Sequence, residues 1–366
     1  MRIGLLTYHH SANYGAVMQS YATCRALKEL GHEVEFINFR QDEKRSNSSI
    51  IFYFKIKAFD RFMETFYPSE TKVIQSMDDL NAIASNYDCL MVGSDQVWNP
   101  GISQSKCLAY FLDFGESDIR RISYASSFGI SKWPEQYQSL LPSINSSLHR
   151  FCSISVREET GKYLLNSLFK LNSQVVLDPT LLHADYNEIT GSIVNNDEVI
   201  CYLLNRGKLQ LEKTSRLSRS LGKTPKMIST IRPTFGFRYV YPPSIENWIR
   251  YIAGAKFVIT DSFHGLAFSL IYNKQFVVIS PSNGKNSRLK DLLKSVGLED
   301  RYFDENDPII YRELQNKKID YNKVNSNLGN SRNHLSFWLV SFAFLSLSLS
   351  DIRYYISSVS ECQPLF

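Results

Sequence analysis

Short apolar runs that end in polar residues recur along this chain, and they restrict its fold more than any other feature. In one of them, the run Phe257 to Ile259 ends in a polar turn, and a new apolar segment begins at Leu266. This is the pattern of a buried parallel strand that leads directly into a helix. Repeated strand–helix units build α/β sheets, in which the carboxyl ends of the strands face the ligand crevice.

The repeated units fall into two consecutive series, as expected for a chain of 366 residues, which exceeds the usual size of a single core. The first series starts with the strand Ile3 to Thr7 and the second with the strand Val199 to Leu204. The polar stretch Gly191 to Asp197 between them is the expected linker. We therefore predict an α/β fold of two Rossmann-like domains that face a central cleft, the GT-B-like arrangement. The predicted domains are residues 1–190 and 197–310, and residues 311–366 form a C-terminal helical or apolar tail.

Composition narrows the class of protein. Hydrophobic residues make up 43% and charged residues 21% of the chain, which is ordinary for a soluble globular enzyme and leaves little room for disorder. The net charge of +5 is dispersed and too small to indicate a nucleic-acid partner, but it is compatible with anionic small molecules or a weak attraction to anionic lipid. The six cysteines are scattered without a Cys-x-x-Cys pair, which favours reduced thiols in a cytoplasmic protein. The N-terminus leads straight into a strand, so no signal peptide is expected.

The turn after the strand Phe257 to Thr260 contains the strongest candidates for chemistry. Asp261, Ser262 and His264 lie where the next helix should begin, and a histidine there can carry a proton near neutral pH. The N-terminus of a helix also attracts anions. The alternative interpretation is structural: Asp261 or Ser262 caps the helix, and His264 is a partly buried neighbour of the cap.

Two other strand ends carry polar side chains that should reach the same crevice. The loop after the first strand contains Asn13 and Gly15, which can present amide groups to a ligand, although a tight turn explains them equally well. The next buried strand ends in Ser94, Asp95 and Gln96. The first of these loops lacks the Gly-x-Gly-x-x-Gly pattern, so no dinucleotide cofactor is expected. The histidines and carboxylates also lack the spacing of metal ligands.

Six motifs, in their order along the chain, resemble the polysaccharide pyruvyl transferase family. Each motif is weak by itself, but the six in the family's order cover roughly Arg2 to Arg301 and make the resemblance specific. They are Asn13-Tyr14-Gly15-Ala16 with Gln19 and Tyr21, Val92-Gly93-Ser94-Asp95-Gln96-Val97-Trp98-Asn99, Tyr124-Ala125-Ser126-Ser127-Phe128-Gly129, Ser155-Val156-Arg157-Glu158-Glu159, Asp178-Pro179-Thr180-Leu181-Leu182 and Thr260-Asp261-Ser262-Phe263-His264-Gly265. The resemblance implies a GT-B-like fold and the transfer of enolpyruvate from phosphoenolpyruvate to a sugar, as a pyruvate ketal.

The implied chemistry requires cations, because phosphoenolpyruvate carries a carboxylate and a phosphate. Arg157 is the first expected anion ligand. Lys285 and Arg288 lie just past a later strand end and are expected to hold the phosphate. The structural alternatives are a surface ion pair of Arg157 with Glu158 or Glu159, and a solvated basic loop around residues 285–288.

His264 is the expected catalyst, either as the general acid to the enolpyruvate methylene or as the base for the sugar hydroxyl. The expected substrate-binding residues are Asn13, Gly15, Ser94, Asp95, Gln96, Arg157, Ser262, Lys285 and Arg288. One departure from the family concerns this site, because relatives often have Arg-Leu-His where this chain has Ser262-Phe263-His264. Without this arginine the anion site is weaker, so the sequence supports the fold more strongly than it supports the identity of the donor.

The expected partners follow from the resemblance. They are phosphoenolpyruvate as donor and a sugar of a cell-surface or secreted polysaccharide as acceptor, either free or on a lipid-linked oligosaccharide; no cofactor is expected. Two other interpretations stay open. One is a GT-B glycosyltransferase that uses a nucleotide sugar. The other is a non-catalytic glycan-binding relative, which the serine at position 262, in place of the usual arginine, suggests. The expected location is the cytoplasm, either in solution or at the inner face of the membrane.

The C-terminal segment Leu335 to Ser350 has no charged residue, and leucine alternates with serine at residues 345–350. It is slightly short and too serine-rich for a membrane span. In GT-B folds the last helix crosses back onto the first domain, and burial there is the preferred interpretation. A membrane-surface anchor, with peripheral membrane contact, is the second. An altered reading frame near Asn333 would also explain the residues from Asp351 onward.

Overall fold

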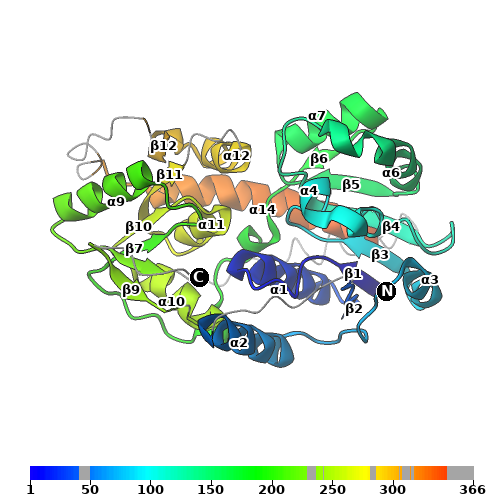
Figure 1. Cartoon of the computed structure of the whole chain (residues 1–366), viewed down its shortest axis with the longest axis horizontal. Coiled ribbons are helices and arrows are strands. Elements are labelled where there is room, and N and C mark those ends of the chain that lie inside the picture. The colour runs from blue at the N-terminus through cyan, green and yellow to red at the C-terminus, as the bar shows by residue number, and fades with distance from the viewer. Residues whose placement is uncertain are drawn as a thin grey trace.

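Two parallel β-sheets, each covered by helices, form the two halves of the molecule (Figure 1). The structure is a computed structural model that describes residues 1–40, 50–228, 236–241, 243–280, 286–304, 306, 314 and 317–343; for residues 50–52 and 333–343 it describes the backbone alone. Every strand pairing in the two sheets, as far as the structure describes the chain, is parallel.

The first sheet has the strand order β2-β1-β3-β4-β5-β6. Its strands are β1 Arg2–Leu6, β2 Glu33–Phe36, β3 Cys89–Val92, β4 Arg120–Ser126, β5 Ser153–Val156 and β6 Gln174–Val175. The helices of this half are α1 Tyr14–Glu29, α2 Ile50–Phe66, α3 Met77–Ala84, α4 Pro100–Ser103, α5 Cys107–Tyr110, α6 Leu141–Leu148, α7 Glu159–Phe169 and α8 Asn187–Thr190, with the 3-10 helices η1 Gln104–Lys106, η2 Glu135–Leu140 and η3 Pro179–Leu181.

The second sheet has the strand order β12-β11-β10-β7-β8-β9. Its strands are β7 Val199–Tyr202, β8 Lys226–Ile228, β9 Arg238–Val240, β10 Phe257–Thr260, β11 Gln275–Ser280 and β12 Tyr302–Asp304. The helices that follow or join these strands are α9 Lys208–Ser220, α10 Ile245–Gly254, α11 Phe263–Ile271, α12 Ser287–Val296, the 3-10 helix η4 Glu299–Arg301 and α14 Tyr321–Ala343.

Each sheet has one position where the strand order reverses. In the first sheet β1 pairs with β2 on one side and β3 on the other, and in the second sheet β7 and β10 form the equivalent central pair. Open α/β sheets bind ligands outside the carboxyl ends of their strands at such points. The loops after β1, β3, β7 and β10 are therefore the expected walls of a binding site.

The unit formed by β10 and α11 is buried throughout. All four residues of β10 and all nine of α11 are buried, as expected for a helix that is apolar on every side and a strand covered on both faces. Gly265 permits the close packing between them, because a Cβ at this position would lie 2.3 Å from Thr260 Oγ1. The start of α11, which carries His264, is thus held rigidly against its strand.

Helix α1 of the first half packs directly against the second half. The ring of Tyr14 stacks on Trp248 of α10, with centroids 5.2 Å apart and planes 7° apart. The Tyr14 hydroxyl donates a hydrogen bond of 2.7 Å to the Pro243 carbonyl. Phe59 of α2 lies 5.0 Å from the same ring. One continuous apolar core therefore includes residues of both halves.

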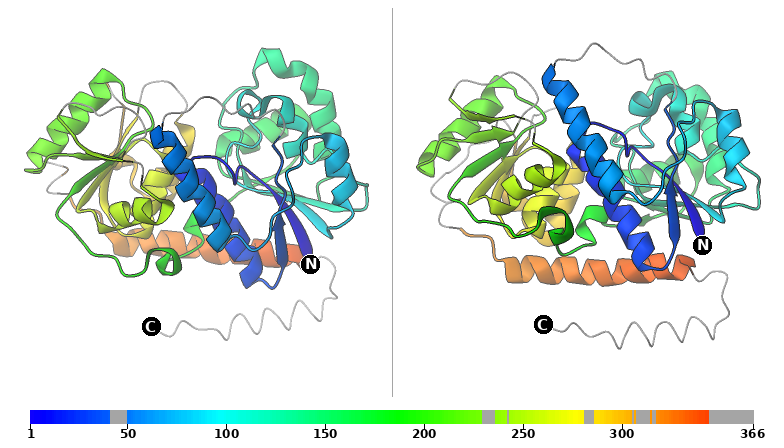
Figure 2. Two further views of the ribbon diagram at one scale, coloured as in Figure 1. Left: turned by 60° about the horizontal axis from the view of Figure 1, so that its bottom comes forward. Right: turned by 90° about the horizontal axis from the view of Figure 1, so that it is seen from below.

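Helix α14 runs past both halves of the molecule (Figure 2). Arg332 Nε donates to the Leu181 carbonyl at 2.6 Å, and Arg332 Nη2 to the His183 carbonyl at 3.3 Å. Residues 335–343 of the apolar C-terminal segment belong to this helix, whereas residues 344–366 lie outside the described residues. Among the helices that the structure describes, none combines the length and the apolar composition of a membrane span. The predicted domain boundaries and the role of the tail stay predictions.

Candidate active site

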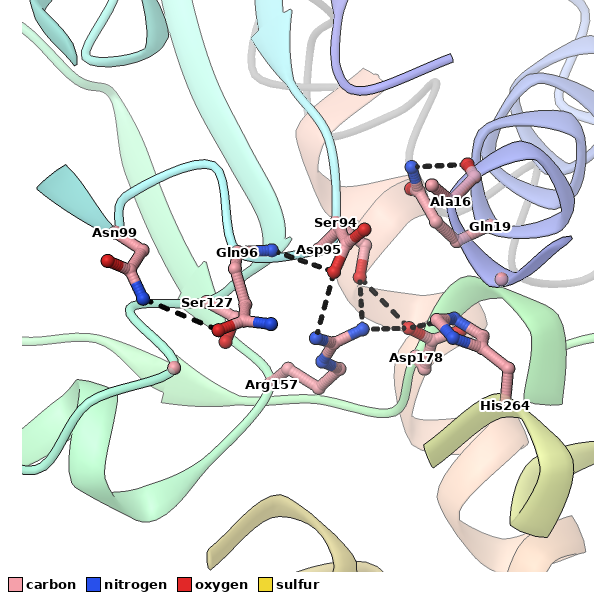
Figure 3. A network of polar contacts seen from close by, with 12 residues as sticks. Ala16, Gln19, Ser94, Asp95, Gln96, Asn99, Ser127, Arg157, Asp178 and His264 are labelled. Atoms are coloured by element: carbon pink, nitrogen blue, oxygen red, sulfur yellow. Dashed lines mark hydrogen bonds and ion pairs between the residues drawn. The ribbon is translucent and has the colours of Figure 1, made fainter. Parts of the chain in front are cut away.

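Asp178 connects the side chains at the ends of the central strands (Figure 3). Its Oδ1 accepts hydrogen bonds from Thr180 N at 3.0 Å and Thr180 Oγ1 at 2.7 Å, and its Oδ2 accepts from Ser94 Oγ at 3.0 Å and Arg157 Nη1 at 2.7 Å. Burial acts to raise the pKa of Asp178, but nearby His264 and Arg157 outweigh it and hold this pKa well below the ordinary carboxyl range. Asp178 is therefore a fixed negative charge between Arg157 and His264.

Arg157 follows β5, and its side chain is only 1% exposed, which excludes the surface ion pair considered as an alternative. Its Nη2 lies 3.6 Å from Asp95 Oδ1, and its guanidinium carbon lies 4.6 Å from the ring centroid of Phe263. Its Nε and Nη2 have no hydrogen-bond partner. Burial acts to lower the pKa of Arg157, but Asp178, Asp95 and Glu158 more than compensate, so the pKa is raised. Arg157 thus stays charged and keeps donors for a ligand.

His264 packs against Gly15, which belongs to the other half of the molecule. A Cβ at Gly15 would lie 2.0 Å from His264 Nδ1, so only glycine leaves room for the ring. His264 Nε2 is buried and points toward Asp178 Oδ2 at 3.7 Å, without a hydrogen bond. A histidine that faces a fixed carboxylate and also lines the space between the two halves is suited to proton transfer.

A cavity of about 300 Å³, here called the front cavity, opens beside His264 between the two halves. Asn13 and Gln96 contribute to its wall. Asn13 caps α1, because its Oδ1 accepts from Gly15 N at 2.9 Å. Asp95, also in the wall, has a φ of 78°, in the left-handed region. That conformation costs a non-glycine residue roughly 1 kcal/mol and is often retained at ligand sites.

Asp261 and Ser262, which line the same cavity, stabilise the start of α11 and the adjacent loops. Ser262 Oγ accepts from Gly265 N at 3.3 Å and so caps α11. Asp261 accepts from Leu204 N at 2.6 Å and Asn205 N at 2.8 Å, which ties the loop after β10 to the loop after β7. The capping interpretation of Ser262 is therefore correct, and its role in binding a substrate stays a prediction.

A second cavity of about 410 Å³, here called the rear cavity, shares Phe263 and Arg288 with the front cavity. Arg157 and Asp178 belong to its wall only. Arg288 is half-buried and has no hydrogen bond or ion pair with any residue that the structure describes. Burial and then the charge of Arg157 lower the pKa of Arg288, and both residues line the rear cavity. Lys285, the other predicted phosphate ligand, lies outside the described residues.

His9, His10 and Glu70 form a group that could hold a metal ion. His9 Nε2 lies 2.9 Å from Glu70 Oε1, and His10 Nε2 contacts the same oxygen. However, Arg40 Nη2 contacts His10 Nδ1. Because Arg40 only donates, His10 Nδ1 must accept, and the proton of a neutral His10 then lies on Nε2, which cannot bind a metal. We read the group as a polar network that fixes the loop after β1, and we assign no metal to it.

Two buried carboxylates are missing from the predicted site residues. Asp178 carries the central contacts described above, although in the sequence it is only part of a family motif. Glu158 is buried, and its Oε1 accepts from Ser127 Oγ at 2.8 Å and Phe128 N at 3.1 Å. Both residues follow apolar runs at strand ends, which is the same signal that indicated Asp95 and His264.

Comparison with solved structures identifies the architecture. A putative UDP-N-acetylglucosamine 2-epimerase from Listeria monocytogenes has a TM-score of 0.54 and 11% identity, covering 91% of this chain and 94% of that chain. A UDP-GlcNAc 2-epimerase from Methanocaldococcus jannaschii, in complex with UDP-GlcNAc and UDP, has a TM-score of 0.51 and 13% identity, covering 93% and 100%. UGT89C1 from Arabidopsis thaliana, complexed with UDP-L-rhamnose, has a TM-score of 0.51 and 8% identity, covering 92% and 98%. At these identities the similarity shows the fold alone, and it confirms the predicted GT-B-like class.

Comparison with sequences identifies the family. A search of curated proteins finds no match to this chain. The model of the family described as Polysaccharide pyruvyl transferase matches residues 13–283. This range begins at Asn13, the cap of α1, and includes Asp178, Arg157 and His264. Because the match spans most of the chain and all of the central contacts, the chain belongs to the polysaccharide pyruvyl transferase family.

Proposed function

We propose that the protein transfers the enolpyruvyl group of phosphoenolpyruvate to a sugar of a cell-surface or secreted polysaccharide and forms a pyruvate ketal. The observation that carries this proposal is the row Arg157–Asp178–His264, in which a buried arginine and a histidine lie on either side of one carboxylate. The Nε and Nη2 atoms of this arginine have no hydrogen-bond partner. Membership of the family supports a transferase.

The chemistry assigns one role to each side chain in the row. His264 protonates the methylene carbon of phosphoenolpyruvate, and positive charge develops at the adjacent carbon, C2. A sugar hydroxyl attacks C2, the bond from C2 to the phosphate oxygen breaks, and a second hydroxyl of the same sugar then attacks C2. Of the two hydroxyl protons, one restores His264 and the other leaves with the phosphate. Asp178 faces His264 Nε2 at 3.7 Å and keeps the imidazole oriented.

Five of the predicted binding residues are assigned to the two substrates. Arg157 and Arg288 bind the carboxylate and phosphate of the donor, for which guanidinium groups are well suited. Asn13 and Gln96 offer amide groups to the hydroxyls of the acceptor. Lys285 remains a predicted phosphate ligand. We extend the proposal to an acceptor that is free or lipid-linked, and to a cytoplasmic protein that acts in solution or at the inner face of the membrane.

The proposal is tested by incubating the protein with phosphoenolpyruvate and a panel of sugars while phosphate release is measured. Phosphate release that requires both substrates is the expected result. A parallel measurement of the melting temperature compares phosphoenolpyruvate with UDP-sugars, because a ligand at about 100 times its Kd stabilises the folded state by about 2.7 kcal/mol. Stabilisation by a UDP-sugar alone would favour a GT-B glycosyltransferase. Stabilisation by a glycan without turnover of either donor would favour a non-catalytic binding protein.

A further inference from the structure

We propose that the two cavities separate the two substrates: phosphoenolpyruvate occupies the rear cavity, the acceptor sugar occupies the front cavity, and Phe263 with Arg288 forms the partition between them. This inference rests on the proposed function and adds to it the route and the place of each substrate. Phe263 and Arg288 line both cavities, whereas Arg157 lines only the rear one and His264 only the front one.

The rear cavity has the charges that a small dianion needs. Its wall contains Arg157 and Arg288, of which Arg157 has two N–H groups without a hydrogen-bond partner. The same wall contains two carboxylates that oppose an anion. Both already have partners, because Asp178 is bound to Arg157 Nη1 at 2.7 Å and Asp291 Oδ2 accepts from Glu159 N at 3.3 Å. Among these four charged side chains, the two guanidinium groups therefore supply the N–H donors that an anion needs.

The front cavity offers amides and an imidazole, together with the carboxylates of Asp95 and Asp261, which already have partners. Asp95 Oδ1 accepts from Gln96 N at 2.9 Å and lies 3.6 Å from Arg157 Nη2. The carboxylate of Asp261 in its wall is occupied by the backbone N–H groups of Leu204 and Asn205 and by the side chain of Gln210 at 3.2 Å. Asn13 and Gln96 present amides to this space. Amides and an imidazole match the donors and acceptors of sugar hydroxyls, whereas a phosphate placed here would meet Arg288 as the only described cation of the wall.

The two cavities meet where the chemistry must occur. Asp178 in the rear wall lies 3.7 Å from His264 Nε2 in the front wall. Phe263 precedes His264 in the chain and packs its ring against the Arg157 guanidinium, 4.6 Å from ring centroid to guanidinium carbon. A donor bound between Arg157 and Arg288 would also reduce the repulsion between these two cations. Its reacting carbons then need to pass only the edge of Phe263 to reach the imidazole and the acceptor.

Blocking one cavity at a time tests the inference. Ser295 lies on an exposed part of α12 in the rear wall, and Leu204 is 54% exposed in the front wall. We expect Ser295→Trp to weaken phosphoenolpyruvate binding by about tenfold or more, as measured by calorimetry, whereas Leu204→Trp should change it by less than about threefold. Ser295→Ala and Leu204→Ala are the matched controls without added bulk. Ser331→Trp, in the rear wall on α14, repeats the test if Ser295→Trp does not fold.

The outcomes are distinguishable. If the wild-type protein does not bind phosphoenolpyruvate, the proposed function and this inference fail together. If it binds and Leu204→Trp weakens binding while the rear variants do not, the donor lies in the front cavity and only the separation of substrates is overturned. Equal weakening by front and rear variants, or no weakening by either, would also overturn the separation. Circular dichroism and melting temperatures like those of the alanine controls are required for each tryptophan variant.

Discussion

At the scale of single residues, His264 is held by packing on one side and by charge on the other. Gly15 leaves room for its ring, and Asp178 lies 3.7 Å from its Nε2. Because the ring fills space as well as facing a carboxylate, its removal tests packing and chemistry at once. The two effects separate only when stability, donor binding and rate are measured on the same variant.

We expect His264→Ala to reduce turnover by about 10²–10⁴-fold, the usual effect of losing a general acid or base, while phosphoenolpyruvate still binds. Initial rates of phosphate release across pH, together with thermal unfolding, check this. His149→Ala is the control, since His149 is exposed on the surface. A His264→Ala protein that is equally stable and turns over within about threefold of wild type would show that His264 is not the catalyst.

Arg157 requires a conservative substitution. Arg157→Ala would leave Asp178 buried without its cation, which costs about 3–5 kcal/mol and threatens the fold. Arg157→Lys keeps the charge but loses the planar fork, so phosphoenolpyruvate binding should weaken by roughly 1.5–3 kcal/mol. Lys208→Ala, on an exposed position of α9, should leave the affinity unchanged. Equal affinities of the two variants in calorimetry would remove Arg157 from the donor site.

At the scale of secondary-structure elements, two helical glycines provide a matched pair. Gly15→Ala places a Cβ 2.0 Å from His264 Nδ1, whereas a Cβ at Gly329 in α14 meets no atom within 4 Å. Alanine favours a helix over glycine by about 1 kcal/mol, so Gly329→Ala should raise stability and keep activity. Gly15→Ala should reduce activity by about 100-fold through displacement of His264. Full activity of Gly15→Ala, measured beside its melting temperature, would contradict this packing.

Helix α2 carries a buried lysine whose charge is unfavourable in the folded state. Lys55 Nζ contacts the Ala12 carbonyl and lies 5.0 Å from the ring centroid of Tyr14, and burial lowers the pKa of Lys55 to about 8. Its pKa in an unfolded chain is about 10.4, so between these values the unfolded state binds more protons and stability rises with pH. Below pH 8 the full penalty of charging the buried amine is present.

Lys55→Met should remove this contribution. We expect the free energy of unfolding of the wild type to rise relative to Lys55→Met by up to about 3 kcal/mol between pH 8 and pH 10.5, from the size of the pKa shift. Urea unfolding of both proteins at several pH values measures the difference, in which all other titrating groups cancel. Parallel pH profiles would mean that Lys55 is not desolvated in the folded protein.

At the scale of the whole molecule, features that depend on local sequence patterns were predictable, whereas features that depend on contacts between distant segments were not. The strand ends at Asn13, Asp95, Arg157 and His264 are visible in the sequence because each follows an apolar run, and the structure brings these loops together. The central place of Asp178 was not predictable, because it depends on how the two halves pack. The same is true of the two cavities, whose partition by Phe263 and Arg288 joins segments that are distant in the chain.

The packing of the halves also determines how the molecule should unfold. Tyr14 of α1 is buried between them, stacks on Trp248 and donates to the Pro243 carbonyl. Removing a buried aromatic side chain typically costs about 3–5 kcal/mol. Because this contact joins two sheets that each also have apolar clusters confined to their own half, its loss weakens the coupling between the halves more than it weakens those clusters.

We therefore expect one calorimetric transition for the wild type and two for Tyr14→Ala. Tyr163→Ala, which removes a ring that is 67% exposed, should unfold like the wild type. Phosphoenolpyruvate bound between the halves stabilises only the docked state, so near 100 times its Kd it should restore about 2.7 kcal/mol and draw the two transitions of Tyr14→Ala together. A single transition of Tyr14→Ala at a lower temperature would show that the halves do not fold independently. If Tyr14→Ala still shows two separate transitions with saturating phosphoenolpyruvate, the binding site of phosphoenolpyruvate lies within one half, away from the contact between Gly15 and His264.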